Sequence, residues 1–511
     1  MKSRTFYTGR NILWGYVSST VTILLSFLSR TVFIYTIGIE YLGINGLFTS
    51  ILGVLSLTEL GIGTAMNYSL YKPVAEGDRE MVKSLMKLYK TAYRWIAIVV
   101  LCLGMILLPF LDKLIKGAEG LRYIKLYYSI FLFNTVSSYF VSYKYGLINA
   151  EQKNYIITNI TTVFNVITNI TQIVFVLLFK RYIVYLFLQA SFQLAQKIYI
   201  AIYINKTYPY LQEKNVVSLG MDETRKISRN VRALIFHKIG EISVNQTDNI
   251  IISAFIDVTS VGLVSNYTLI TSTVNTFVNV IFNGTTGSLG NLFATADRKK
   301  QLQVFKVMDF VGFWIFSFAS IAIVALVQPF ISLIWGEKYT LPLTVVGLFI
   351  LNNYMVGLRI SINNIKIAGG IFERDKYLAI IQSITNLVLS IVLVRKIGLV
   401  GIFIGTIVSG AVPSLIRPYI VFKELFQEES VQYYVLYLKR LILTVAIAVL
   451  CYVISKNIMR NMIWQAFIVD ALIIGVLPNV VFLLLYGRSE EFKYLLTMVK
   501  AYFIRKNRIV H

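Results

Sequence analysis

Residues 343–370 read LTVVGLFILNNYMVGLRISINNIKIAGG, an apolar stretch long enough to cross a bilayer that carries polar residues at helical spacing. Arg359, Asn363 and Lys366 recur at steps of four and three, which places a guanidinium, an amide and an ammonium on one helix face. At membrane depth such a face is tolerated only where it looks into protein or water. A second apolar span, near residues 231–256, repeats the pattern with His237, Glu241, Asn245 and Asp248. Two helices with charged faces predict a route for a polar cargo.

The composition of the chain indicates a membrane protein. Of its 511 residues, 56% are hydrophobic and only 14% are charged, whereas a soluble domain carries about 25% charged residues. The net charge of +24 would suggest nucleic-acid binding in a soluble protein, but here the basic residues gather in short loops between apolar spans. Both cysteines fall inside predicted spans, and one of the two histidines is the last residue. We therefore expect no disulfide framework, no metal site and no cofactor.

Apolar segments predict about 14 transmembrane helices, each of roughly 20 residues. The inside loops then hold roughly 30 Lys and Arg against roughly 11 outside, which predicts that both termini are cytoplasmic. No cleavable signal peptide is expected, because the first span is too long and lacks a small-residue cleavage pattern. The outside loops are too short for a catalytic domain, so we expect no enzyme. The predicted spans lie near 12–36, 44–70, 86–111, 123–148, 155–179, 182–204, 230–256, 261–290, 304–331, 343–370, 376–394, 398–422, 438–456 and 462–486.

Internal echoes predict two parallel six-helix lobes followed by two extra helices. Gly43, which opens the second span, corresponds to Gly262, which opens the eighth. At an offset of 222 residues, Lys144, Glu151 and Tyr155 match Lys366, Glu373 and Tyr377. An even number of helices returns the chain to the same side, so the repeats share one orientation with cargo expected between them. The predicted division is 1–205 for the first lobe, 206–229 for a cytoplasmic loop, 230–425 for the second lobe and 426–511 for the last helices and a basic tail.

Basic residues predicted inside spans are the candidates for binding an anionic cargo. Arg30 ends a polar stripe with Thr22 and Ser26, and it either faces a central cavity or snorkels to the interface. An arginine at bilayer depth costs about 2.5–3.5 kcal/mol, which favours a functional role for Arg30 and, nearer mid-membrane, for Arg359. Lys144 and Lys366 lie closer to the cytoplasmic ends, where snorkelling and a shared cleft remain equal alternatives.

Acidic residues inside spans carry two interpretations. Glu59, Glu241, Asp248 and Asp470 are the carboxylates concerned. A desolvated carboxylate can couple transport to protons or cations. The alternative is structural pairing, of Glu241 with His237 one turn earlier, or of Glu59 or Asp248 with Arg30 across helices.

Uncharged polar faces mark the fifth and eighth spans. Either these side chains bond neighbouring helices, or together they line a path for carbohydrate hydroxyls. The residues are Thr158, Thr162, Asn165, Asn169 and Gln172 in the fifth span, and Asn275, Asn279 and Asn283 in the eighth.

Several motifs give the chain a resemblance to a known family. Ser29-Arg30-Thr31, YLGINGLF at 41–48, LTELGIG at 57–63 and Tyr71-Lys72-Pro73 occur in the first half, and Asp248-Asn249 with Ser265-Asn266-Tyr267 occur in the second. The whole chain resembles the Wzx-type polysaccharide flippases of the multidrug/oligosaccharidyl-lipid/polysaccharide (MOP) exporter superfamily.

The resemblance implies a MATE-like, all-α membrane protein that moves undecaprenyl-diphosphate-linked oligosaccharides between leaflets by alternating access. It also implies a bacterial cytoplasmic membrane location, a monomer, and work beside polysaccharide polymerase and glycosyltransferases. Arg30 looks like the helix-one arginine that related lipid II flippases use for the substrate diphosphate. Arg359, Asn363, Lys366 and Lys144 match no family motif, so their assignment to the diphosphate and glycan rests on position alone.

Two other functions stay open at this point. A cation-coupled multidrug exporter of the same superfamily would favour acidic over basic residues in its cavity. A membrane glycosyltransferase or polymerase would need a larger outside loop than the sequence provides. There is no G-x-x-x-x-G-K-[ST] segment, so the chain has no nucleotide-driven motor of its own.

Overall fold

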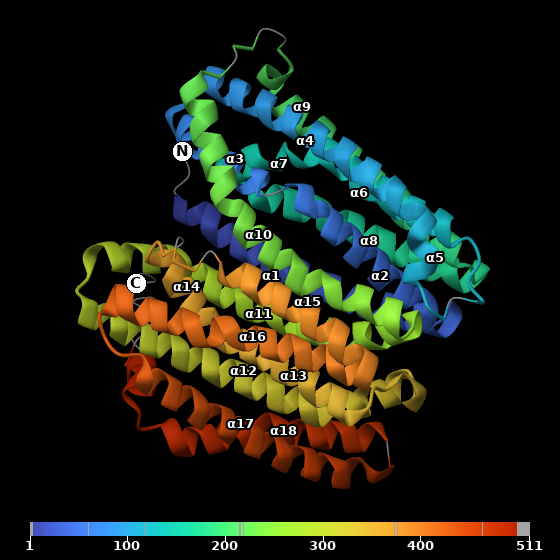
Figure 1. Cartoon of the computed structure of the whole chain (residues 1–511), viewed down its shortest axis with the longest axis vertical. Helices are drawn as coiled ribbons and strands as arrows, with labels where there is room; N and C mark the ends of the chain where they lie inside the picture. The colour runs from blue at the N-terminus through green and yellow to red at the C-terminus, as the bar shows by residue number, and fades with distance from the viewer. Residues whose placement is uncertain are drawn as a thin grey trace, which may run out of the picture. The chain divides into compact units, whose positions relative to one another are not determined.

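The computed structural model describes residues 4–497 apart from 60, 118, 214–215, 218, 372–373, 376 and 462. The side chains of residues 4–13, and of several residues within 226–245 and 280–295, lie outside that description. All regular structure in the described part of the chain is helical (Figure 1). The predicted all-α class is confirmed.

Unit 1 covers Met1–Asn266 and contains the helices that carry Arg30 and Lys144. Three short 3₁₀ segments lie between its helices: η1 (Ser56–Glu59), η2 (Leu108–Phe110) and η3 (Pro209–Gln212). These helices are α1 (Arg4–Thr36), α2 (Ile39–Leu55), α3 (Ile62–Glu76), α4 (Arg79–Leu107), α5 (Leu111–Leu114), α6 (Ile124–Ser142), α7 (Tyr145–Ala150), α8 (Asn154–Phe179), α9 (Tyr182–Thr207), α10 (Met221–Phe255) and the start of α11 (Val258–Thr295).

Unit 2 covers Tyr267–His511 and contains the rest of α11. Its core forms around α12, whose Phe310 and Phe313 pack against α18 residues including Phe482. The remaining helices are α12 (Arg298–Ile334), α13 (Leu343–Leu358), α14 (Ile360–Ala368), α15 (Leu378–Ile397), α16 (Leu399–Val421), α17 (Val431–Ile458) and α18 (Trp464–Tyr486).

A helix, or two consecutive helical segments, occupies each of the fourteen predicted spans. Within the described residues, ten helices are long and apolar enough to cross a membrane. The four other spans correspond to α6, α9, α10 and α11. The sequence explains part of this difference, because α10 and α11 carry the ionisable and amide faces noted above. The protein is a multi-pass membrane protein.

Three predicted spans are broken rather than continuous. The second span splits at Gly61, whose φ of 76° lies in the left-handed region that glycine adopts without strain. Within the fourth span, α6 ends at Ser142 and α7 begins directly after Lys144. Within the tenth span, α13 ends at Leu358. Arg359 is both the C-cap residue of α13 and the N-cap residue of α14. Arg359 alone separates α13 from α14, and Leu343–Ala368 as a whole is long and apolar enough to cross a membrane, so the predicted span and the helical steps from Arg359 to Lys366 are retained.

The starts of α2 and α11 approach one another closely within unit 1. A Cβ added to Gly43 would lie 1.9 Å from the carbonyl oxygen of Val258, and one added to Gly262 would lie 2.4 Å from that of Ile39. Further along, Asn249 Nδ2 of α10 donates to Ser50 Oγ of α2 at 3.0 Å. The two glycines that the repeat relates are therefore both at a backbone contact that only glycine permits.

The boundary between the two units falls at Asn266, inside α11, and α10 packs with α2 in unit 1. The predicted boundary at 206–229 follows the sequence repeat instead. The division at Asn266 reflects how the helices pack, whereas the predicted division reflects the repeat in the sequence. The lobe assignment stays a prediction.

Candidate functional site

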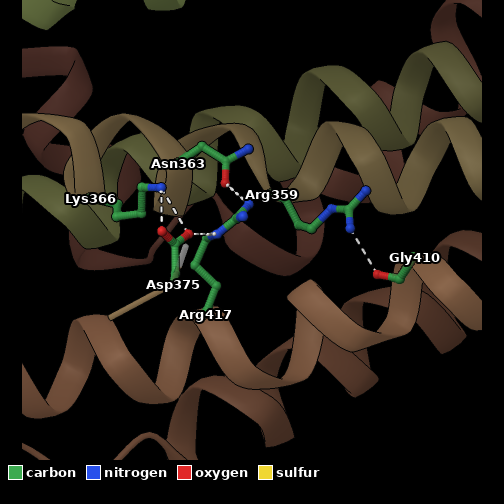
Figure 2. A network of polar contacts seen from close by, with 6 residues as sticks. All are labelled: Arg359, Asn363, Lys366, Asp375, Gly410 and Arg417. Carbon is green, nitrogen blue, oxygen red and sulfur yellow. Dashed lines mark hydrogen bonds and ion pairs between the residues drawn. The ribbon is translucent and has the colours of Figure 1, made fainter. Parts of the chain in front are cut away.

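A polar network in unit 2 joins α14, the loop that follows it and α16 (Figure 2). Lys366 Nζ donates to both carboxylate oxygens of Asp375, at 2.9 and 2.8 Å. Arg417 Nε donates to Asp375 Oδ2 at 2.9 Å, and Arg417 Nη1 donates to Asn363 Oδ1 at 2.6 Å. One fully buried carboxylate therefore holds two cations, and one of those cations orients the Asn363 amide.

Arg359 lies beside this network but has a different kind of partner. Its side chain is 7% exposed, and its Nη1 donates to the backbone carbonyl oxygen of Gly410 in α16 at 2.8 Å (Figure 2). The positive charge of Arg417 is close enough to repel that of Arg359. Among the described residues, no carboxylate forms an ion pair with Arg359, so its charge is not neutralised there.

Arg30 occupies a comparable position in unit 1. Its Nη1 donates to Ser265 Oγ and to Asn266 Oδ1, each at 3.1 Å. Both acceptors are neutral and belong to α11, within the Ser265-Asn266-Tyr267 motif that contributes to the family resemblance. No ion pair of Arg30 occurs in the part of the chain that the structure describes. Arg30 therefore does not pair with Glu59, which was one of the alternatives left open.

The described carboxylates inside helical spans are mostly engaged by protein donors. Glu59 accepts a hydrogen bond from Tyr93 Oη, and Asp470 accepts one from Ser455 Oγ at 2.5 Å. Asp309 in α12 pairs with Arg440 in α17, and both side chains are buried. These contacts favour the structural interpretation of the acidic residues.

The residues of the α10 face are only partly described. The side chains of His237, Glu241 and Asn245 lie outside the described residues, and Asp248 is half-buried in α10. The proposed pairing of His237 with Glu241 stays a prediction.

The polar face of the fifth span, now α8, bonds to neighbouring helices and to itself. Thr162 shares a hydrogen bond with Ser18 of α1, and Gln172 Nε2 donates to the Tyr185 carbonyl of α9 at 3.1 Å. Asn169 Nδ2 donates to the carbonyl of Asn165 at 2.8 Å. The structure therefore shows bonding to neighbouring helices for Thr162 and Gln172, whereas Asn169 bonds within α8.

Lys144 lies in a separate cavity of unit 1, of about 540 Å³, between α4, the α6–α7 turn and the segment after α9. Its Nζ donates to Asn205 Oδ1 at 2.6 Å, and its side chain is 8% exposed. Basic residues of α4 line the same cavity at steps of four, three and four: Lys83, Lys87, Lys90 and Arg94. In the sequence, the lysines of this face served only to predict the topology.

Comparisons with known proteins agree with this architecture. The family described as "Polysaccharide biosynthesis protein" matches residues 8–286, more than half of the chain. The chain belongs to this family. No curated protein matches the chain.

Several solved structures share the fold of this polysaccharide biosynthesis family member. An inward-facing multidrug resistance MATE family transporter of the MOP superfamily is similar with a TM-score of 0.60 at 16% identity, over 80% of this chain and 98% of that one. A mutant of the Vibrio cholerae MATE transporter VcmN gives a TM-score of 0.55 at 14% identity, over 83% and 100% of the two chains. An outward-facing MATE family transporter gives 0.51 at 14% identity, over 80% and 93%. The MATE-like fold class is confirmed.

The sequence singled out Arg30 and Arg359 as candidates, but it did not point to Asp375 or Arg417. Arg417 stands near the end of a predicted span, where basic residues are expected for topology alone. Asp375 falls just before a predicted span. Its distance of nine residues from Lys366 gives no helical signal, because the intervening chain is a loop.

Proposed function

We propose that the chain flips polyprenyl-diphosphate-linked oligosaccharides across the bacterial cytoplasmic membrane by alternating access, with both termini inside. The observation that carries this proposal is the state of Arg30 and Arg359. Both guanidinium groups donate to neutral oxygens, at 3.1 and 2.8 Å, and pair with no described carboxylate. Arg359 is buried and Arg30 is half-buried, and a cation withdrawn from water without a counter-ion is costly. A diphosphate would supply the missing charge through charge-assisted hydrogen bonds.

The network around Asp375 gives the neighbouring surface its shape and charge. Its carboxylate offsets one of the two positive charges on Lys366 and Arg417, so the cluster in Figure 2 stays net positive with Arg359 included. Asn363 presents an amide whose oxygen is already held by Arg417 and whose nitrogen is a donor. We assign Arg359 to the diphosphate, Asn363 to glycan hydroxyls, and Lys366 to holding the α14–α15 loop.

Membership of the polysaccharide biosynthesis family supports a lipid-linked glycan as cargo. The surface polymer would be of the capsule, O-antigen or teichoic type, with polymerase and glycosyltransferases as working partners of a monomeric transporter. A cation-coupled multidrug exporter is the alternative. Its chemistry calls for available carboxylates, whereas Glu59 and Asp309 are engaged by Tyr93 and Arg440.

The contact between Gly43 and Val258 supports the alternating-access part of the proposal. Two helices can approach one another most closely where their backbones meet without a side chain between them, as glycine permits. We assign the starts of α2 and α11 to such a closure.

The test uses the full chain in proteoliposomes that contain a fluorescent undecaprenyl-diphosphate oligosaccharide. The rate at which label becomes accessible to an external quencher is measured for wild type, Arg30→Gln and Arg359→Gln. Each variant should lose about tenfold to hundredfold in rate, because a hydrogen bond to a charged group contributes about 1.5–3 kcal/mol.

Arg298→Gln is the matched control. Arg298 is the first residue of α12, is exposed, and donates a hydrogen bond to Gln427 Oε1. It should flip the lipid at the wild-type rate. Wild-type rates in both Arg30→Gln and Arg359→Gln would overturn the proposal. Transport of a cationic dye by wild type, with no flipping of the labelled lipid, would favour the drug-exporter alternative.

A further inference from the structure

The basic cavity of unit 1 is built mainly by α4. Lys83, Lys87, Lys90 and Arg94 lie on one face of this helix, and Lys144 approaches from the turn between α6 and α7. Lys90 and Lys144 are close enough to repel each other. Among the residues that the structure describes, five cations and a single carboxylate, Glu213, line this cavity.

Only part of this positive charge is compensated by the protein. Lys83 forms ion pairs with Glu80 and Glu213, at 2.5 and 2.7 Å. Lys87 and Lys144 instead donate to neutral oxygens, those of Val216 at 3.4 Å and Asn205 at 2.6 Å. Lys90 and Arg94 form no ion pair with any described residue. The cavity therefore offers a site for an anion with several contacts to phosphate oxygens.

An apolar groove of about 560 Å³ continues from this cavity. Asn205 lines both, and the groove then runs between α4, α6 and α9, which lie side by side (Figure 1). On α4 the groove begins seven residues beyond Arg94, at Leu101, a rise of about 10 Å. Along α9 it covers residues 194–205, about 16 Å of helix.

The walls of the groove are suited to a hydrocarbon chain. Phe133, Phe140, Ile198 and Ile202 line it and are more than half exposed in the protein alone. The one charged group in the wall, Lys197, is tied by three hydrogen bonds of 2.6–2.9 Å to Asn134 and Ser137. Lipid must cover this face in a membrane, because these large apolar side chains cannot face water.

We propose that the cavity and groove together bind one anionic phospholipid of the bilayer. Its phosphate lies against Lys90, Arg94 and Lys144, and one acyl chain lies between α6 and α9. The excess of cations selects an anionic headgroup, because the ammonium of a zwitterionic lipid would be repelled. Bulk phospholipid rather than the transported lipid is the occupant, because the groove opens on a face of exposed apolar residues where bulk lipid is most concentrated.

The proposal does not depend on the cargo of the transporter. It uses the predicted orientation, in which the α4 cations meet the cytoplasmic leaflet. Bound lipid would fasten α4 to α9, the two helices that flank the groove.

The first test measures lipid binding by the purified full chain in detergent, using native mass spectrometry with phosphatidylglycerol and phosphatidylethanolamine. Wild type should bind one phosphatidylglycerol in preference to phosphatidylethanolamine. Lys90→Gln with Arg94→Gln should weaken phosphatidylglycerol binding about 30-fold. Lys113→Gln with Lys125→Gln removes the same charge near exposed Asp112 and should change binding less than about threefold. Equal loss in both double variants, or equal binding of the two lipids, would overturn the proposal.

The second test addresses the groove. Ala201→Trp fills it next to Lys144, whose Nζ lies 3.5 Å from the Ala201 carbonyl oxygen. Long-chain phosphatidylglycerol should bind at least about tenfold more weakly, because a buried chain contributes about 0.8 kcal/mol per CH₂. If Ala201→Trp is not monodisperse, Ile202→Trp on the exposed rim replaces it.

Two competitors identify the source of the phosphate. Soluble glycerol phosphate should displace phosphatidylglycerol only weakly, because it lacks the chain. Displacement by inorganic phosphate at the same concentration as lipid would show a free-phosphate site and overturn the lipid assignment. Preferential binding of undecaprenyl phosphate over phosphatidylglycerol would assign the site to the transported lipid, which would also overturn it.

Discussion

Replacing Asp375 by Asn tests whether the network in Figure 2 is held by a single buried charge. The carboxylate accepts two bonds from Lys366 and one from Arg417, all between 2.8 and 2.9 Å, and its side chain is fully buried. An amide keeps one acceptor oxygen, but its NH₂ group would face one of the two cations. Removing one partner of a buried ion pair costs about 3–5 kcal/mol because the other charge stays buried.

The expected result is a large loss of thermal stability. At about 2–4 °C per kcal/mol for a domain the size of unit 2, the Tm of Asp375→Asn should fall by about 6–20 °C. Unfolding is followed in detergent on the full chain by heating and counting the monodisperse fraction. Arg374→Gln is the matched control, since Arg374 pairs with Glu424 at 3.6 Å on the surface, where such a pair contributes about 0–1 kcal/mol.

A Tm for Asp375→Asn within 2 °C of wild type, or equal to that of Arg374→Gln, would refute the reasoning. The same measurement on Lys366→Met is informative. Arg417 still neutralises Asp375 in that variant, so its loss should be smaller than that of Asp375→Asn.

Three further predictions concern packing and hydrogen bonding. Tyr93→Phe removes the donor to Glu59 and should cost about 1.5–3 kcal/mol in unfolding free energy, measured by the same heating assay; no change would show that water replaces the bond. Gly357→Ala places a methyl group 2.1–2.4 Å from ring atoms of Phe316 in α12 and should lower the free energy of unfolding by about 1–3 kcal/mol. Gly347→Ala in α13, the same helix, meets nothing within 4 Å and should raise the free energy of unfolding by up to about 1 kcal/mol. Gly43→Ala collides with a backbone oxygen at 1.9 Å, so lipid flipping in proteoliposomes should fall more than about tenfold, and wild-type flipping would exclude the closure assigned to this contact.

The positions of the helices could be predicted because a bilayer imposes a length on every apolar run. The breaks within spans are harder to predict. Gly61 signals its break by its residue type, but nothing in the sequence around Arg359 distinguishes a capped junction from a continuous helix. The side chain of Arg359 at that junction bonds the carbonyl oxygen of Gly410, which lies 51 residues further along the chain.

Part of the candidate site could be predicted because a charged residue inside an apolar span is rare and stands out in the sequence. Arg30 and Arg359 were found on that ground, and the structure gives both only neutral described partners. Asp375 was missed because its role depends on how a loop folds back onto α14. The basic face of α4 was missed because cytoplasmic lysines have a sufficient explanation in topology, which concealed their regular spacing.

The meeting of Gly43 with the carbonyl of Val258 has a mechanical consequence. Backbone meets backbone at this contact, with the side chains of Val258 and Ile39 beside it, so few rotamers must be reset if the two helices separate and return. A joint of this kind gains its tightness from proximity and loses it over a short displacement, because dispersion forces fall steeply with distance. In the proposed closure, the contact between Gly43 and Val258 can break and form again repeatedly without repacking of the helices.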